Sequence, residues 1–266
     1  MKISLRTKIL RLILGMLIAS SIATITSVLF ATNSNVERQA RENLSTGLRV
    51  FQQLMSVRGQ QLFDSAEVLT SDFGFKGAVA QGDQKTIVSV LENYSARIDA
   101  DMMLLSTLDG QLIASTDTST KTFPFKNLLT KAEKENGLMT VALLDGKAYQ
   151  MVMLQVSAPR PIAWAIIGFL LDQSMADEFK QLTNLEVSYK GIYQADKHFM
   201  VSTLSNDKFF KDLALRGNEP TGAWQVEEFS SEHYLSLNTP LANEATYQID
   251  AILSTSLSDA YSKSAR

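Results

Sequence analysis

The sequence predicts an α+β fold in which one long N-terminal helix precedes two successive antiparallel sheet units. Residues 33–70 show helical periodicity without a proline, and the segments that follow alternate strands with short helices in an order that recurs after residue 184. The chain has 266 residues, of which 45% are apolar and 20% charged, so it can bury a sizeable core. Cysteine is absent, which excludes disulfides, zinc-thiolate sites and thiol nucleophiles.

Charge is distributed unevenly along the chain. Residues 1–11 contain four basic residues and no acidic one, whereas the rest contains 21 basic and 28 acidic residues and carries a net charge of −7. An acidic body lacks the basic surface that binding to a phosphate backbone requires. We therefore expect no nucleic-acid partner.

Residues 12–31 form a stretch of twenty residues without a charge. A helix of about 20 residues at ~1.5 Å per residue spans a hydrocarbon core of ~30 Å. Because the basic residues precede this stretch, we expect residues 1–11 in the cytoplasm and 32–266 outside the inner (cell) membrane, in the periplasm. The alternative is a cleaved signal peptide, but its apolar region is usually only ~7–15 residues long, and Val28–Ala31 is a poor cleavage site.

Residues 32–70 are predicted to form a stalk helix that continues from the membrane segment. Apolar or small residues recur there at a mean spacing of 3.67, and a helix over 33–70 would extend about 57 Å. These positions are Val36, Ala40, Leu44, Leu48, Phe51, Met55, Gly59, Leu62, Ala66 and Leu69.

The first sheet unit begins after a break at residues 71–75. Asp83 is a typical N-cap for a helix over 84–97, and Asp109-Gly110 is a typical hairpin turn between strands 100–108 and 111–115. A polar stretch and a short helix at 126–135 follow, and then strands at 140–144, 148–156 and 162–171. The last strand is uncharged for ten residues, too short to cross a membrane, and is predicted to be buried on both faces.

A connecting helix over 172–183 leads to the second unit. Its expected elements are strands at 185–193, 198–204, 223–229, 233–237 and 247–253, a helix at 207–215, a loop at 218–222 and a polar helical end at 256–266.

Catalytic signatures are missing from the sequence. It contains no phosphate-binding glycine loop, no nucleophile elbow and no zinc-binding helix motif. His198 and His233 are the only histidines, and Asp99 and Asp101 share a strand face without a third ligand nearby. We expect no enzymatic activity, no metal and no cofactor.

A ligand site is easier to place. The segment 116–146 is expected to cover the sheet face opposite the long helix, which creates a pocket for a small molecule. The candidate ligand-binding residues are Tyr149, Met151 and Met153 on one strand face, Trp164 on the neighbouring strand and Arg97 at a helix end. An arginine favours an anionic ligand such as a carboxylate or phosphate. Core packing is the alternative for the first four residues, and a surface salt bridge for Arg97.

Several segments occur in an order that is typical of a known family. They are the cationic start and apolar stretch at 5–31, the helix at 36–70, SDFGF at 71–75, LDGQLIAST at 108–116, and PIAW at 161–164 running into GFLLD at 168–172. The chain resembles, over residues 5–262, the double Cache domain, the tandem PAS-like extracytoplasmic sensor of bacterial transmembrane receptors.

The resemblance implies a membrane-distal unit at 71–184 that binds a small molecule, a membrane-proximal unit at 185–255, and an exit segment at 256–266 that leads to a second membrane helix. It also implies a homodimer and a cytoplasmic output beyond Arg266, often a module of cyclic di-GMP turnover and sometimes a histidine kinase. The amino-acid-binding motif of the family, a Tyr and an Arg in one helix with a strand Asp, is not recognisable here.

Three other functions compete with a sensor of cyclic di-GMP turnover. One is the sensor of a histidine kinase or chemoreceptor. Another is an interaction module without a ligand, in which Trp164 and Tyr149 are fully packed and Leu44 and Phe51 on the stalk helix mediate assembly. The third is an anchored extracytoplasmic enzyme, against which the missing catalytic residues argue.

Overall fold

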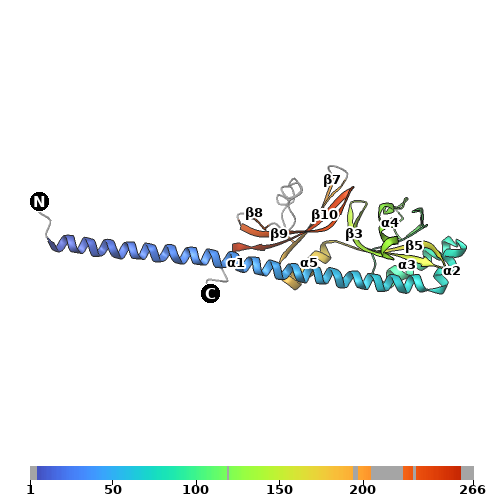
Figure 1. The fold of residues 1–266 in the computed structure, drawn as a ribbon, viewed down its shortest axis with the longest axis horizontal. Helices are drawn as coiled ribbons and strands as arrows, with labels where there is room; N and C mark the ends of the chain where they lie inside the picture. Colours follow the sequence, from blue (N-terminus) through green and yellow to red (C-terminus); the bar gives the residue numbers. More distant parts are fainter. Residues whose placement is uncertain (1–4, 119, 194–196, 205–223, 230–231, 259–266) are drawn as a thin grey trace.

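Two antiparallel sheets lie one after the other along a single long helix (Figure 1). The computed structural model describes residues 5–258 apart from 119, 194–196, 205–223 and 230–231. The side chains of 5–13, 28–34, 227–229 and 232 also lie outside the described set.

Helix α1 (Leu5–Ser71) joins the predicted membrane segment and the predicted stalk in one uninterrupted helix of 67 residues. Every position of the predicted apolar stripe is buried, except Leu48, which is partly buried. Leu44 and Phe51 belong to the core of the protomer itself, with 0% and 1% exposure. They are therefore unavailable for the assembly that the interaction hypothesis assigned to them.

None of the helices, as far as the structure describes them, combines the length and the apolarity that crossing a membrane requires. The predicted span 12–31 includes residues 12, 13 and 28–31, whose side chains are outside the described set. Side chains 14–27 are all exposed, and Figure 1 shows this part of α1 projecting from the body by itself.

The first unit lies farther from the N-terminal end of α1, and we call it the distal unit (Figure 1). It is a five-stranded sheet in the order β2-β1-β5-β4-β3 with all neighbours antiparallel. Its elements are α2 (Phe73–Gln81), α3 (Gln84–Ile98), β1 (Met102–Ser106), β2 (Leu112–Ser115), α4 (Lys126–Glu135), β3 (Leu138–Leu144), β4 (Lys147–Ser157) and β5 (Pro161–Leu170).

Most predicted elements of the distal unit are present, and α2 is the addition. The break predicted at 71–75 is a helix start, because the Asp72 carboxylate accepts a hydrogen bond of 2.6 Å from the backbone N–H of Phe75. Asp83 caps α3 in the predicted way. Asp145 and Gly146 both have positive φ, as a type I′ turn between β3 and β4 requires.

The second unit, which we call the proximal unit, repeats the strand order of the first as β7-β6-β10-β9-β8. It consists of α5 (Gln173–Thr183), β6 (Glu186–Tyr193), β7 (Lys197–Ser202), β8 (Trp224–Phe229), β9 (Glu232–Glu244) and β10 (Tyr247–Ser256). The helix predicted at 207–215, the loop at 218–222 and residues 259–266 of the predicted exit segment lie outside the described residues.

Strand β9 is longer than the predicted 233–237 because it continues through Pro240. The register shifts between Ile249 and Asp250 of β10, where Asp250 pairs with Pro240. A bulge of this kind tolerates a proline, which cannot donate a hydrogen bond to the neighbouring strand.

Helix α1 forms one wall of both units. One core contains the proximal sheet, α5 and four residues of α1, Ala40, Leu44, Phe51 and Met55. The other core contains the distal sheet, α2, α3 and three residues of α1, Leu62, Ala66 and Leu69. The turn end of the β3–β4 hairpin joins the proximal core through Val141 and Ala148. The two sheets thus share one continuous support.

Two glycines allow α1 to approach the sheets closely. A Cβ at Gly47 would overlap Cδ1 of Leu185, which precedes β6, and a Cβ at Gly59 would lie 3.0 Å from Nε2 of Gln150 on β4. The Gln150 side chain is buried and donates from Nε2 to the backbone carbonyl of Met55 at 2.5 Å. Each unit therefore contacts α1 closely at a glycine.

We predict that Gly47→Ala destabilises the protein, because its methyl group overlaps a buried leucine. Overpacking of this kind costs about 1–3 kcal/mol in the free energy of unfolding. Gly77→Ala is the matched control: Gly77 is also helical but has nothing within 4 Å of its Cβ position, so alanine stabilises α2 by up to about 1 kcal/mol. Urea unfolding monitored by circular dichroism measures both values, and a Gly47→Ala variant as stable as wild type would contradict the close contact.

Candidate functional site

The structure brings together four of the five residues that the sequence analysis selected as ligand contacts. Tyr149, Met151 and Met153 lie on the face of β4 that points away from α1, and Trp164 lies on the same face of β5. All four belong to one buried cluster, with exposed fractions of 7%, 0%, 0% and 2%. Burial raises the pKa of the Tyr149 phenol, so the phenol stays protonated at neutral pH.

Arg97 lies elsewhere. It is an exposed residue in the last turn of α3, and its guanidinium lies 5.7 Å from the ring centroid of Tyr94. Tyr94 in turn donates from its hydroxyl to the backbone carbonyl of Ser65 on α1 at 2.8 Å. Since α3 packs on the face of the distal sheet that contacts α1, Arg97 is separated by the sheet from the other four residues.

Only part of the segment 116–146 covers the distal sheet on the side opposite α1, because Leu138–Leu144 form β3, the edge strand of that sheet. Phe123 and Phe125 precede α4, and Leu128, Leu129 and Ala132 line its inner face. These side chains pack directly on Tyr149, Met151 and Met153, so the centre of this face is filled by side chains. One open space lies at the edge of the cover.

That space is a cleft of about 570 Å³ between α4 and the turns that precede β2 and β5, and we call it the α4 cleft. Trp164 is the one predicted ligand contact that borders it. The cleft is lined by Leu108, Asp109, Lys126, Leu129, Thr130, Glu133, Gln155, Arg160, Pro161 and Trp164.

Charges of both signs surround the α4 cleft. Asp109 accepts a hydrogen bond of 2.5 Å from the Thr107 hydroxyl, and this bond, together with the charge of Lys126, lowers the pKa of its carboxyl group. Arg160 is exposed, and among the described residues it has no carboxylate partner. The cleft therefore offers one unpaired guanidinium beside an aromatic side chain, an arrangement that suits a planar anion.

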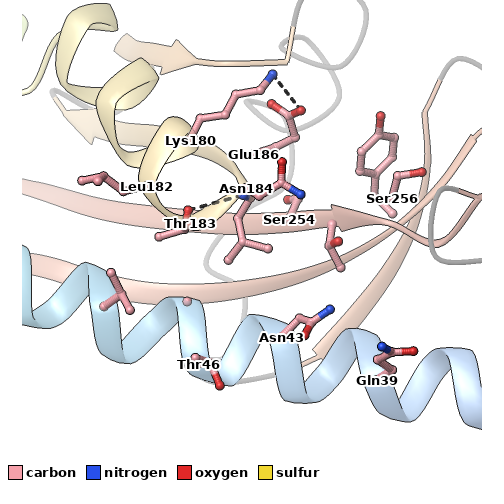
Figure 2. Close-up of a pocket in the computed structure, with 15 residues that line it drawn as sticks. Gln39, Asn43, Thr46, Lys180, Leu182, Thr183, Asn184, Glu186, Ser254 and Ser256 are labelled. Atoms are coloured by element: carbon pink, nitrogen blue, oxygen red, sulfur yellow. Dashed lines mark hydrogen bonds and ion pairs between the residues drawn. The ribbon is translucent and has the colours of Figure 1, made fainter. Parts of the chain in front are cut away.

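A second open space of about 520 Å³ lies between α1 and the proximal unit, and we call it the α1–α5 groove (Figure 2). Residues of α1 form one side, and the end of α5 with β6, β9 and β10 forms the other. Its lining consists of Gln39, Asn43, Thr46, Gly47, Val50, Lys180, Leu182, Thr183, Asn184, Leu185, Glu186, Tyr234, Ser254, Thr255 and Ser256.

The two charged residues of the groove neutralise each other. Lys180 Nζ lies 2.9 Å from a carboxylate oxygen of Glu186, and Figure 2 shows this ion pair at the upper edge. The Thr183 hydroxyl already has a hydrogen-bond partner within α5, because it donates to the backbone carbonyl of Phe179 at 2.6 Å. The remaining polar groups of the lining are amides and hydroxyls.

The corresponding face of the proximal sheet, opposite α1, carries several buried polar groups beside a small apolar cluster around Leu204 and Ile252. Lys190 and Asp250 are 6% and 8% exposed and stand opposite each other on β6 and β10. Burial raises the pKa of Asp250, whereas hydrogen bonds and the charge of Lys190 act to lower it. Two pairs of serine hydroxyls on the same face are hydrogen-bonded, Ser188 to Ser202 at 2.6 Å and Ser236 to Ser254 at 2.8 Å.

The weaker metal-ligand candidates do not come together. Asp99 is the left-handed C-cap of α3, and Asp101 accepts a hydrogen bond of 2.7 Å from the backbone N–H of Leu170. His198 and His233 lie on β7 and β9, which two other strands separate. In the part of the chain that the structure describes, no group of three His, Cys, Asp or Glu residues is arranged to hold a metal ion.

Sequence reasoning missed both the cations of the α4 cleft and the whole α1–α5 groove. Arg160 follows Pro159 in a segment that was interpreted only as a break between strands. The polar groove residues of α1, such as Gln39 and Asn43, have the pattern of a solvated helix face. No signal in the sequence distinguishes a helix face in water from one that borders a groove.

Residues 37–250 match the family model described as the double sensory domain of two-component sensor kinase. No curated protein sequence matches the chain.

Three solved structures are similar to the chain in fold. The periplasmic domain of Vibrio cholerae LuxQ has a TM-score of 0.52 at 13% identity, with coverage of 80% of this chain and 99% of that chain. A domain of a putative sensory box/GGDEF family protein from Vibrio parahaemolyticus has a TM-score of 0.52 at 8% identity, with coverage of 86% and 99%. The ligand-binding domain of the Pseudomonas fluorescens chemoreceptor CtaA, solved with L-isoleucine, has a TM-score of 0.50 at 11% identity, with coverage of 90% and 98%.

We predict that Met151 acts as a core residue. Met151→Ala removes a side chain with 0% exposure and should lower the free energy of unfolding by about 2–5 kcal/mol. Met139→Ala on the adjacent strand β3 is the control, since Met139 is 48% exposed and its loss should change stability by about 0.5 kcal/mol or less. Equal, small effects of the two substitutions in denaturant unfolding would show that the space around Met151 is open.

Proposed function

Because the chain belongs to the double Cache family of sensory domains, we propose that it is the extracytoplasmic sensor of a bacterial transmembrane receptor that binds a small carboxylate at the α4 cleft. The observation that carries the ligand assignment is the unpaired guanidinium of Arg160 beside Trp164. A planar guanidinium binds a carboxylate through two parallel hydrogen bonds.

The nature of the cleft also supports the assignment. Its volume of about 570 Å³ lies within the usual range of small-molecule sites. Lys126 adds a second cation, and the carboxylates of Asp109 and Glu133 suit a positively charged or hydroxyl group elsewhere on the same ligand. Tyr149, Met151 and Met153 support Trp164 from below and are proposed to hold its position, and Arg97 has no part in this site.

We propose that residues 12–31 anchor the chain in the inner membrane, with 1–11 in the cytoplasm and 32–266 in the periplasm. Support comes from the helical continuity of α1 through this stretch and from its exposed large apolar side chains, including Leu14, Leu17 and Ile22 at 54%, 60% and 59% exposure. Side chains of this kind are stable in hydrocarbon and unfavourable in water.

Signal transmission is proposed to run through α1, which contacts both sheets and continues toward the anchor. A ligand shifts the equilibrium between two receptor states only by its difference in affinity for them, and full switching requires about 5.5 kcal/mol. Closure of α4 on a ligand in the cleft would press on the sheet that packs against α1. The output in the cytoplasm is proposed to be cyclic di-GMP turnover, with a histidine kinase or chemoreceptor as alternatives.

Self-association along α1 is a second candidate function. Val50, Val57 and Val68 are 39%, 43% and 63% exposed on α1, outside the mostly buried apolar stripe that runs from Val36 to Leu69. Their spacings of seven and eleven residues place them on one side of the helix. A homodimer through this surface is compatible with ligand sensing.

The carboxylate assignment predicts a specific loss on substitution of Arg160. A thermal-shift screen of the full chain against carboxylates, amines and nucleotides should identify a carboxylate, and Arg160→Ala should weaken its binding about tenfold or more. Arg97→Ala is the matched control and should leave the dissociation constant within about twofold, because Arg97 lies on the other side of the sheet.

A fluorescence measurement locates the bound molecule. The substitution Trp224→Phe leaves Trp164 as the only tryptophan. In the wild type the guanidinium of Arg41 lies 5.3 Å from the ring centroid of Trp224, and phenylalanine keeps an aromatic ring at that position. Binding in the α4 cleft should then change the emission of Trp164. A carboxylate that binds equally well to the Arg160→Ala variant, or a screen without any carboxylate, would refute the assignment.

A further inference from the structure

We propose that the α1–α5 groove is a second binding site, specific for an uncharged ligand rich in hydroxyl groups, such as a sugar or an inositol. The groove has a volume of about 520 Å³ and lies in the proximal unit, whereas the α4 cleft belongs to the distal unit. The proposal does not depend on the function assigned to the α4 cleft.

The described lining carries no net charge, which favours an uncharged ligand. Among the described residues of the lining only Lys180 and Glu186 are charged, and their side chains form an ion pair of 2.9 Å. The pair is partly exposed, and Glu186 also accepts a hydrogen bond of 2.5 Å from the Thr203 hydroxyl, so both charges already have partners within the protein. An uncharged ligand leaves the pair intact.

Hydrogen-bonding groups face the groove from both sides. Gln39 and Asn43 of α1 and Asn184 at the end of α5 carry side-chain amides for which no hydrogen bond is found among the described residues. Each amide both donates and accepts, as a hydroxyl group does, so a ligand with several hydroxyls can match all three. The hydroxyl group of Thr255 adds a further partner.

Apolar side chains at the same groove suit the C–H surface of a ring. Leu182 is 59% exposed and Val50 is 39% exposed, and both line the groove although neighbouring apolar residues are buried. Polar amides beside exposed aliphatic groups match a molecule that has hydroxyl edges and an apolar face.

The position of the groove would allow a bound ligand to hold α1 against the proximal sheet. Gly47, which lies within the lining, marks the close approach of α1 to Leu185. A molecule that contacts Asn43 and Asn184 together would bridge α1 to the α5–β6 connection next to this point. It would thereby hold α1 against the proximal sheet, on the side of the body from which α1 projects (Figure 1).

The test uses the full chain in lipid nanodiscs with glucose, maltose, trehalose and myo-inositol as probes. Saturation-transfer NMR should detect binding of at least one probe to the wild type. The Gln39→Leu/Asn43→Leu variant should lose at least tenfold in affinity, because it removes two amides from the groove. Gln53→Leu is the matched control, since it makes the same change at an exposed position of α1 outside the groove and should bind like wild type.

Two further measurements separate the alternatives. Arg160→Ala should bind the sugar probe with unchanged affinity, so that failure of the carboxylate site and failure of this site are distinguished. Sedimentation velocity reports whether the groove instead contacts a second copy of α1. The proposal is overturned if no probe binds the wild type, if Gln53→Leu weakens binding as much as the double variant, or if the double variant changes only the dimer equilibrium.

Discussion

Packing of both sheets against one helix is the constraint on which the rest of the structure depends. Each sheet has an apolar face that requires a cover, and α1 covers both with a single stripe of small and apolar residues. The contact is close enough that a Cβ at Gly47 would overlap Cδ1 of Leu185 and that Gln150 reaches the helix backbone at Met55. Neither unit has a complete core without its part of α1, and so the two units are mechanically connected although their sheets are separate.

The two units share a strand order but differ on the faces that point away from α1. In the distal unit this face carries Met151, Met153 and Trp164 under α4, whereas in the proximal unit it carries Lys190, Asp250 and two pairs of serines. A buried polar face is stable only if its groups find partners, and the hydrogen bonds between serine hydroxyls on adjacent strands meet part of that demand. The same strand order therefore supports different layers in the two units, an apolar layer in one and a layer of mixed polar and apolar groups in the other.

Local patterns in the sequence were sufficient for most of the elements. Helix α4 was predicted with its observed ends at Lys126 and Glu135, and the face shared by Tyr149, Met151 and Met153 follows from strand alternation alone. Helix α2 was missed because Asp72 ends one helix and caps the next within a few residues. The extension of β9 was missed because a bulge that accommodates Pro240 depends on the partner strand, which the local sequence does not specify.

The site was harder to predict than the fold, because it depends on how elements dock. Arg97 was selected as the candidate cation because it ends a helix, but the docking of α3 against α1 places it on the wrong side of the sheet. Arg160 reaches the cleft only because the turn before β5 brings it beside α4. Periodicity and spacing contain no information on such distances between elements.

The two glycine contacts on α1 fix the orientation of one sheet relative to the other, which a flexible loop would not do. Gly47 and Gly59 are twelve residues apart on a rigid helix, so the number of residues between them sets the angle at which the two sheets are attached. One inserted residue would turn everything beyond it by about 100° around the helix axis. Natural variants of this chain are accordingly expected to differ in the lengths of their surface loops while the count of residues in this stretch of helix stays constant.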